Sequence, residues 1–302
     1  MVQGVKKKKA IGINKPWEAY AFLMPWILGL LAFTVIPMFM SLYFSFTQYD
    51  MMTPPRWIGV ANYIDMLKDP RVHKSLQVTS TYVFLGVPFQ LAFALMIAVI
   101  LRKNRRGIRY YRAVYYLPSL FGGSVAVSIL WRQIFNREGA VNQFLSLFGI
   151  IGKNWIGTPS TVLYTLIILH IWQFGSSMVI FLGGLKNISP DYYEAAEIDG
   201  AGKVGSFFYI TLPLLTPMVF FNIVMTIINA FQAFTSSYII SGGTGSPVDA
   251  TLFYTLYLYI KAFRQFSMGY ASAMAWVLLI IIALITRLMF VIADKWVYYE
   301  DK

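Results

Sequence analysis

The sequence contains no cysteine and only two histidines, His73 and His170. The lack of cysteine excludes disulfide frameworks, thiolate nucleophiles and zinc or iron–sulfur sites held by thiolates. Two histidines leave little material for a histidine-rich metal site. Charged residues are also scarce, at 13% of the chain, whereas a soluble globular domain carries about a quarter. These shortages point away from metal and thiol enzymes and from the soluble class.

Apolar residues are abundant instead, at 58% of the 302 residues. Runs of about 20 apolar residues, the length that crosses a hydrocarbon core, recur along the chain. The sequence therefore predicts an all-α polytopic membrane protein with a cytoplasmic segment 1–17, a single membrane domain 18–293 and a tail 294–302. Its six transmembrane helices are expected at about 18–45, 76–101, 113–135, 160–184, 213–239 and 270–293.

Positive charge is concentrated in short blocks beside apolar runs, notably residues 6–9 and 102–112. Membrane orientation explains this placement of the +12 net charge better than nucleic-acid binding does. With the N-terminus inside, fifteen Lys and Arg residues fall on inside segments and eight on outside segments. The positive-inside rule then places both termini in the cytoplasm. The first apolar run is too long for a signal peptide, so a retained helix is expected.

The segment at about 186–212, between the fourth and fifth predicted spans, contains the letters GAGKVG, which match the dinucleotide fingerprint G-x-G-x-x-G. That fingerprint needs a strand before the first glycine. Here Ser189 as N-cap and Pro190 at the first helical position predict a helix. Lys203 is followed by valine, so the segment is no phosphate-binding loop either. Any ATP must therefore be hydrolysed by another chain, and the plain alternative for this segment is a solvated linker.

The same segment resembles the EAA loop of permease subunits in binding-protein-dependent ABC importers, and it precedes the penultimate predicted helix as in that family. The matching positions are Glu194, Ala195, Ala196, Gly200, Ile210, Leu212 and Pro213. The stretches WIGVANY (57–63) and GYASAMAW (269–276) are similar to the sugar-type branch. That branch includes permeases for maltose, other oligosaccharides and glycerol phosphate.

The resemblance implies a type I importer permease in a bacterial inner membrane. Residues from Pro190 to Asp199 would form a coupling helix on which Glu194 makes a charge-assisted contact with an ATPase subunit. Gly200 would permit the sharp reversal after it, and Pro213 would open the next membrane helix. The implied partners are a second homologous permease, two cytoplasmic ATPase subunits that use ATP and Mg²⁺, an extracellular solute-binding protein, the sugar and membrane lipid. The chain itself is expected to catalyse no reaction and to bind no cofactor, metal or nucleic acid.

Polar residues at helical spacing predict a substrate path, because such side chains are costly against lipid. The fifth span carries Asn222, Thr226, Asn229, Ala233 and Ser236 on one face, with Gln232 at its edge, and the fourth carries His170, Gln173 and Ser177 with Trp172 nearby. Amides, hydroxyls and an aromatic platform suit a hydroxyl-rich ligand. The alternative is hydrogen bonding between helices, worth about 0.6 kcal/mol per pair.

Two bases, Arg132 and Arg287, fall within the predicted spans, and both lie near a span end where they can reach the interface. A neutral oligosaccharide is therefore the first expectation, before a uronate-containing sugar or glycerol phosphate. A polytopic membrane enzyme would need carboxylates at the membrane face, and a proton-coupled carrier would need one at mid-membrane. The predicted spans supply no such mid-membrane carboxylate.

Overall fold

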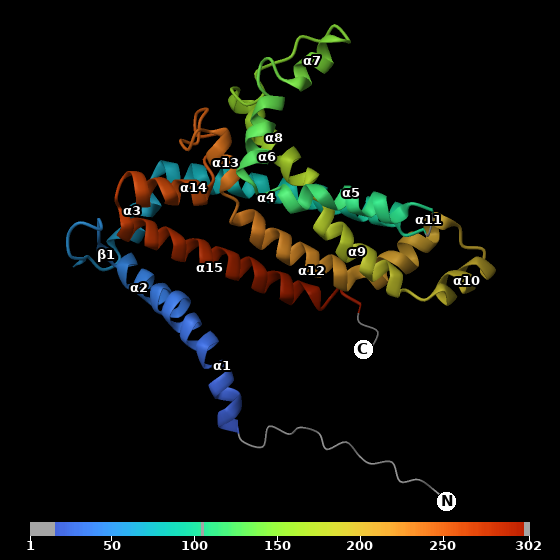
Figure 1. Cartoon of the computed structure of the whole chain (residues 1–302), viewed down its shortest axis with the longest axis horizontal. Coiled ribbons are helices and arrows are strands. Elements are labelled where there is room, and N and C mark those ends of the chain that lie inside the picture. The colour runs from blue at the N-terminus through green and yellow to red at the C-terminus, as the bar shows by residue number, and fades with distance from the viewer. Residues whose placement is uncertain (1–15, 104–105, 299–302) are drawn as a thin grey trace, which may run out of the picture.

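The computed structural model describes residues 16–103 and 106–298. Three long helices, α4 (Pro70–Leu101), α12 (Leu212–Phe231) and α15 (Met268–Ala293), run side by side along the longest axis (Figure 1). One end of this bundle carries the strand β1 (Thr47–Gln48) and the other end carries the helix α10 (Pro190–Ile198). These ends are called the β1 end and the α10 end below.

Within the described residues, five helical segments are long and apolar enough to cross a membrane, and a bent pair supplies a sixth. The five are Tyr20–Ser45, Pro70–Leu101, Pro159–Asn187, Lys203–Ile240 and Met268–Ala293. Each overlaps one predicted span, so the helical membrane class is confirmed. The second helix begins earlier than the expected residue 76, because Asp69 caps it by accepting a hydrogen bond from the Arg71 amide at 2.9 Å.

The third predicted span, 113–135, is not one straight helix. It consists of α5 (Ile108–Phe121) and α6 (Val125–Ile134), which meet at an angle of 99°. The break has a local cause, because two glycines are followed by Ser124, whose extended backbone and side-chain bond from the Val127 amide start a new helix. The expectation of an unbroken helix was therefore wrong here.

The fourth span is also divided, into α8 (Pro159–Trp172) and α9 (Gly175–Asn187), with Gln173 at the division. This break lies against the α5–α6 break. The Gln173 side-chain amide donates to the Gly122 carbonyl at 2.8 Å, and the Ser119 hydroxyl donates to the Gln173 carbonyl at 3.0 Å. Because a broken helix leaves backbone groups unpaired, these side-chain bonds satisfy groups that the two breaks expose.

The fifth span begins earlier than expected. The short helix α11 (Lys203–Ser206) and the π-helical turn η2 (Phe207–Thr211) lead without interruption into α12. Pro213 is the second residue of α12, near its start as the sequence predicts, but α11 and η2 extend the helical run before it. Residues 203–211 of the predicted loop are likewise helical. At its other end α12 stops at Phe231, so Ala233 and Ser236 lie beyond it, Ser236 in α13 (Thr235–Ile240).

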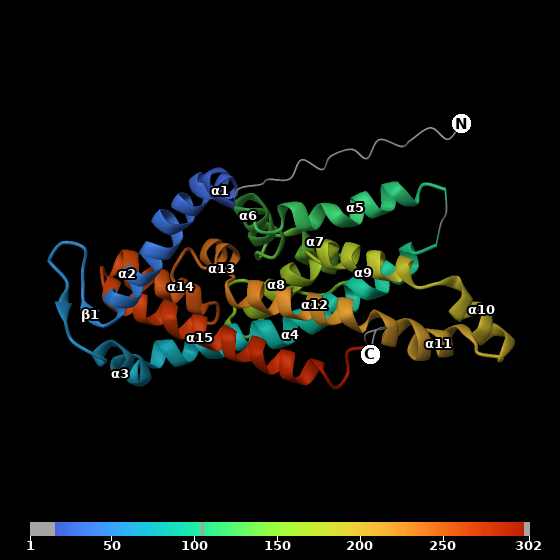
Figure 2. The same cartoon turned by 90° about the horizontal axis from the view of Figure 1, so that it is seen from below.

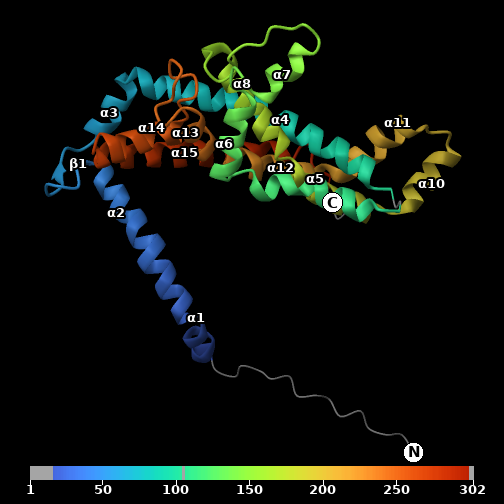
Figure 3. The ribbon, with the colours of Figure 1, turned by 45° about the horizontal axis from the view of Figure 1, so that its top comes forward.

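The first span projects away from the bundle (Figures 1 and 3). It consists of α1 (Pro16–Leu30), a π-helical turn η1 (Leu31–Val35) and α2 (Ile36–Ser45). The α2 part packs on the bundle, against α15. Its large apolar side chains are exposed; Phe22 and Phe33, for example, are each 84% exposed. This arm therefore presents an apolar surface in the isolated chain, as a membrane-embedded segment does.

The β1 end is built from short elements that include a two-stranded antiparallel hairpin, which the all-α expectation did not contain. Its elements are β1, β2 (Arg56–Trp57), α3 (Ala61–Lys68), α14 (Tyr254–Tyr259) and the π-helical turn η3 (Ile260–Arg264). Gly269 at the start of α15 lies so close to the Thr47 carbonyl that a side chain would overlap it. Gly269 therefore allows α15 to pack closely against β1.

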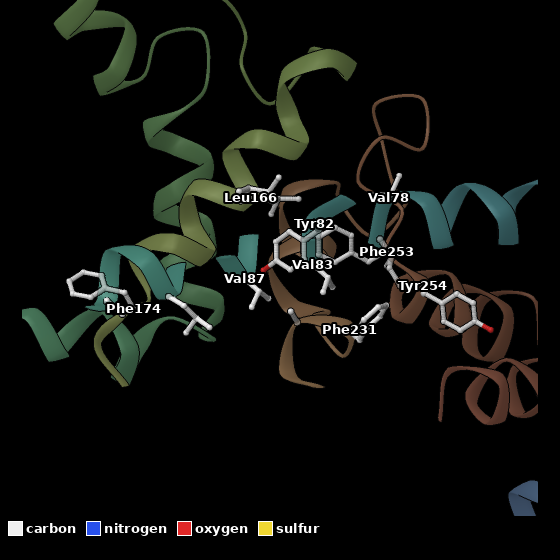
Figure 4. Close-up of a cluster of buried hydrophobic side chains, with 14 of the residues drawn as sticks. Val78, Tyr82, Val83, Val87, Leu166, Phe174, Phe231, Phe253 and Tyr254 are labelled. Carbon is white, nitrogen blue, oxygen red and sulfur yellow. The ribbon is translucent and has the colours of Figure 1, made fainter. Parts of the chain in front are cut away.

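The core lies where α4 meets α8, α12 and the segment before α14. Tyr82, Val83 and Val87 of α4 are buried against Leu166 and Phe253 (Figure 4). The connection between α6 and α8 lies outside this core. It contains the short helix α7 (Ala140–Ser146), which projects from the bundle (Figures 1 and 3).

Candidate functional site

A cavity of about 610 Å³ lies between α4, the two helix breaks and α12. Its polar lining includes Gln90, Ser119, His170, Gln173, Ser176, Ser177, Asn222, Thr226, Asn229, Gln232, Thr235 and Ser236, and its apolar lining includes Tyr82, Leu169, Ile180, Phe221, Met225, Ala230, Ala233 and Phe234. Among the described residues, no Asp, Glu, Lys or Arg side chain lines it. The site therefore offers hydrogen bonds and apolar surface without a formal charge.

The structure brings together six of the seven residues predicted for the substrate path. Asn222, Thr226, Asn229 and Gln232 of the fifth span share the cavity with His170 and Gln173 of the fourth. Trp172 is not among the lining residues. Its ring lies 5.9 Å from that of Trp131, and its neighbour in sequence, Gln173, takes the cavity position because the helix breaks there.

The asparagine face changes character along α12. Asn222 is 1% exposed, and its side-chain amide donates to the Met218 carbonyl one turn earlier, at 3.1 Å. Thr226 is also buried, whereas Asn229 is exposed. The bond of Asn222 lies within its own helix, so it does not join two helices, and both asparagines line the cavity.

Two buried polar atoms at this site lack a hydrogen-bond partner within the described chain. They are Nε2 of His170, on a residue 9% exposed, and Oε1 of Gln90, on a residue 6% exposed. Leaving a buried polar atom unpaired costs about 1–3 kcal/mol. Both atoms are themselves covered by neighbouring atoms, so water or a ligand in the cavity reaches them only when those neighbours move.

Sequence reasoning missed the contribution of α4 to this site. Tyr82 and Gln90 line the cavity, and between them Gly86 lets His170 approach, since a Cβ there would lie 3.0 Å from His170 Cδ2. The Tyr82 and His170 rings are 5.1 Å apart. These three α4 residues are spaced four apart and so share one helix face. That spacing was the available signal.

A second feature lies at the α10 end, where α10 projects beyond the bundle (Figures 1 and 2). As expected, Ser189 caps the helix, accepting from the Asp191 amide at 3.3 Å, and Pro190 is its first residue. Gly200 follows with φ +79°, the left-handed conformation that favours glycine. The helix and its glycine turn are confirmed in position.

The predicted loop residues divide into two groups. Glu194, Ala195, Asp199 and Gly200 are exposed on the projecting turn, with Ala196 half-buried beside them. Ile210, Leu212 and Pro213 are half-buried in the helical run that enters the bundle. Next to the first group, Ile198 is 87% exposed and Val204 is 71% exposed. An exposed apolar pair on a projecting turn is typical of a surface that a partner covers.

The glycines of GAGKVG do not form a dinucleotide site of the known kind. A helix precedes them and Gly205 lies within the four-residue helix α11, whereas the fingerprint requires a strand before the first glycine. Within the described ranges there is no group of three or more His, Asp or Glu residues placed to hold a metal ion.

Comparison with known families decides the class. Residues 58–297 match the model of the binding-protein-dependent transport system inner membrane component. The chain belongs to this family. It is a permease subunit of an ABC importer and thus a transport component.

Family members of known sequence resemble the chain over nearly its whole length. The probable ABC transporter permease protein YesP of Bacillus subtilis is 55% identical, over 98% of this chain and 96% of that protein. The lactose transport system permease protein LacF of Rhizobium radiobacter is 33% identical, over 92% and 94%. A chain of a bacterial alginate ABC transporter, crystallised with an alginate pentasaccharide-bound periplasmic protein, superposes with a TM-score of 0.80 at 20% identity, over 92% and 94%. That likeness supports the permease fold.

Proposed function

We propose that this permease moves a neutral oligosaccharide across the inner membrane through the cavity described above. The carrying observation is the cavity lining, which among the described residues offers the polar side-chain atoms of twelve residues and no charged group. A polyhydroxylated, uncharged ligand can satisfy such atoms without desolvating an ion. The relatives' names support the class, since they include permeases for lactose and for arabinooligosaccharides.

An anionic substrate such as glycerol phosphate is the alternative. It would favour a cation in the path, because burying an unpaired anion is far costlier than burying a hydroxyl. Arg132 and Arg287 do not line the cavity. The chemistry of the lining therefore favours the neutral sugar.

The proposed topology has six spans with both termini in the cytoplasm, which makes the α10 end cytoplasmic and the β1 end external. The distribution of Lys and Arg supports this orientation. The bent pair α5–α6 then counts as the third span. An extracellular solute-binding protein would deliver the sugar at the β1 end, and a second homologous permease would complete the path.

In this arrangement α10 is the coupling helix and docks on one of two cytoplasmic ATPase subunits, which bind ATP and Mg²⁺ in place of this chain. The exposed Glu194 would make a charge-assisted contact, and Ile198 would be covered by the partner. Closure of the ATPase pair would draw the coupling helices together and reorient the permeases as rigid bodies. The cavity would thereby open alternately to the two sides.

The test is uptake by cells that express the whole importer, with neutral di- and trisaccharides compared against glycerol phosphate. We expect a neutral oligosaccharide to be taken up. Asn229→Leu should raise the half-saturating sugar concentration about tenfold or more, since a lost polar contact in a buried site costs about 1–3 kcal/mol. Met225→Leu is the matched control, because Met225 lines the same cavity and leucine conserves its apolar character.

Complex yield after purification separates the interpretations. Full yield of the Asn229→Leu complex with weakened uptake supports a ligand contact. A parallel loss of yield and uptake would mean that Asn229 holds helices together. Uptake of glycerol phosphate with no uptake of any neutral sugar would overturn the proposed substrate class.

A further inference from the structure

Tyr193, the residue before Glu194 in α10, joins three elements at one hydroxyl group. The hydroxyl accepts a hydrogen bond from Nη1 of Arg102 at 2.8 Å and lies 2.9 Å from the Thr211 hydroxyl. The Arg102 guanidinium carbon also stands 4.5 Å from the centre of the Tyr193 ring. The aromatic face and the hydroxyl of one side chain thus engage the same cation.

The two partners of Tyr193 belong to the helices that line the cavity. Arg102 is the C-cap residue of α4, which carries Gln90. Its positive charge there also complements the negative end of the helix dipole. Thr211 is 4% exposed and ends the turn η2, directly before α12, which carries Thr226 and Asn229. A single side chain of α10 therefore contacts the ends of both cavity helices.

The backbone links between α10 and α12 are less constraining. The chain leaves α10 through Gly200, which has a left-handed backbone, and Gly202, and a Cβ at either glycine would meet no described atom within 4 Å. Glycines give a connection more conformational freedom than other residues do. This turn by itself therefore links α10 to α12 loosely, and a side-chain bridge would carry a displacement of α10 more directly.

We propose that Tyr193 is a positioning residue that makes α10 move together with α4 and α12, so that displacement of the coupling helix reaches the cavity. This inference rests on the proposed role of α10 as the ATPase contact. Tyr193 does not line the cavity, and its hydrogen bonds go to Arg102 and Thr211. Its role is mechanical, because it prevents α10 from sliding against the ends of α4 and α12.

The test uses spin labels on the full importer, purified with its ATPase subunits. Cysteines replace Asp191, exposed in the first turn of α10, and Ile100, 61% exposed near the end of α4, in a chain that has no native cysteine. The distance between the two spin labels is measured without nucleotide and again after ATP hydrolysis has left ADP trapped with vanadate. With Tyr193 present, the label-to-label distance should form one population that is the same in both states.

Tyr193→Phe keeps the ring but removes the hydroxyl, and we expect a second distance population to appear on trapping. Arg102→Met, which removes the cation that donates to the Tyr193 hydroxyl, should produce the same effect, and Arg102→Lys, which restores a cation, should not. Tyr110→Phe is the matched control, because Tyr110 lies near the start of α5 and is 80% exposed. A single unchanged population in both Tyr193→Phe and Arg102→Met would overturn the proposal.

Two further outcomes distinguish a failure of the Tyr193 bridge from a failure of the proposed sugar transport. The distance measurement needs no sugar, so a failure of sugar uptake in the unaltered importer counts against the substrate and leaves the bridge standing. If Tyr193→Phe lowers the yield of the complex and retains one distance population in what remains, Tyr193 has a structural role only, which contradicts the proposal.

Discussion

The side-chain amide of Gln173 donates a hydrogen bond to the carbonyl oxygen of Gly122, with 2.8 Å between nitrogen and oxygen. Gln173 lies at the break between α8 and α9, and Gly122 at the break between α5 and α6. The backbone carbonyl of Gln173 also accepts from Gln90 and Ser119, at 3.0 Å each. Each helix break would leave backbone carbonyls without a partner. Here the carbonyls of Gly122 and Gln173 are both hydrogen-bonded, and the two breaks together form a wall of the cavity.

Gly122→Ala should weaken this joint. The added Cβ would overlap the Gln173 side chain, which must move and lose its bond to the Gly122 carbonyl. Overpacking of this kind costs about 1–3 kcal/mol. The thermal midpoint of the purified complex should fall, and uptake with it. Gly123→Ala is the control, because a Cβ there meets no described atom within 4 Å. Equal thermal midpoints for the two variants would contradict a stabilising role of the contact between Gly122 and Gln173.

Gly200 should tolerate asparagine but not valine. Its φ of +79° is strained for residues with a Cβ, at a cost of about 1–2 kcal/mol, and asparagine adopts this conformation more readily. Crowding is not the reason, because a Cβ at Gly200 meets no described atom within 4 Å. Copurification of the ATPase subunit should fall for Gly200→Val and persist for Gly200→Asn. Gly202→Val, at negative φ, should bind the ATPase normally; reduced binding there would argue that any bulk on the turn is harmful.

Asp69 should stabilise the β1 end in a pH-dependent way. Its carboxylate accepts from the Tyr257 hydroxyl at 2.6 Å and the Tyr270 hydroxyl at 3.0 Å, and Nζ of Lys261 is 3.5 Å away. Burial alone would raise the pKa of Asp69, but the bonds from Tyr257, the Arg71 amide and Tyr270, with the charge of Lys261, bring it below its ordinary 3.8. Because the folded-state pKa is the lower one, this stabilisation is present at neutral pH and disappears as pH falls through 3.8 and then through the folded value.

Asp69→Asn should therefore lower the thermal midpoint at neutral pH, by the equivalent of about 1–2 kcal/mol, and flatten its decline in acid. The comparison variant is Asp65→Asn, which neutralises an exposed carboxylate in the preceding helix α3. A midpoint that falls equally in both variants would assign the effect to net charge and not to the Asp69 contacts.

The proposed topology predicts the labelling of single cysteines in a chain without background thiols. Ser246→Cys, exposed in the connection before α14, should react with an impermeant maleimide added to intact cells. Ala201→Cys, exposed next to Gly200, should react only after the membrane is opened. The reverse pattern would place α10 outside and remove its role as the ATPase contact.

The sequence by itself determined the membrane class, the approximate spans, the helix that begins at Pro190 and the family. These features depend on local composition and on residues close together in the chain. Apolar length decides whether a helix can span a membrane, and Ser189 followed by Pro190 starts a helix wherever the segment lies. The asparagine face on α12 was likewise readable, because residues three and four apart share a helix face.

Only the tertiary structure decided which of these residues meet. Of the two predicted neighbours, Gln173 lines the cavity and Trp172 does not. The Gln173 side-chain amide is held there by the carbonyl of Gly122, which lies 51 residues earlier in the chain. Tyr193 contacts Arg102 and Thr211, which lie 91 and 18 residues away along the chain. Hydrogen-bond partners at such separations leave no periodic trace in one sequence. They are selected by the packing of whole helices, which brings the ends of α4 and α12 beside α10.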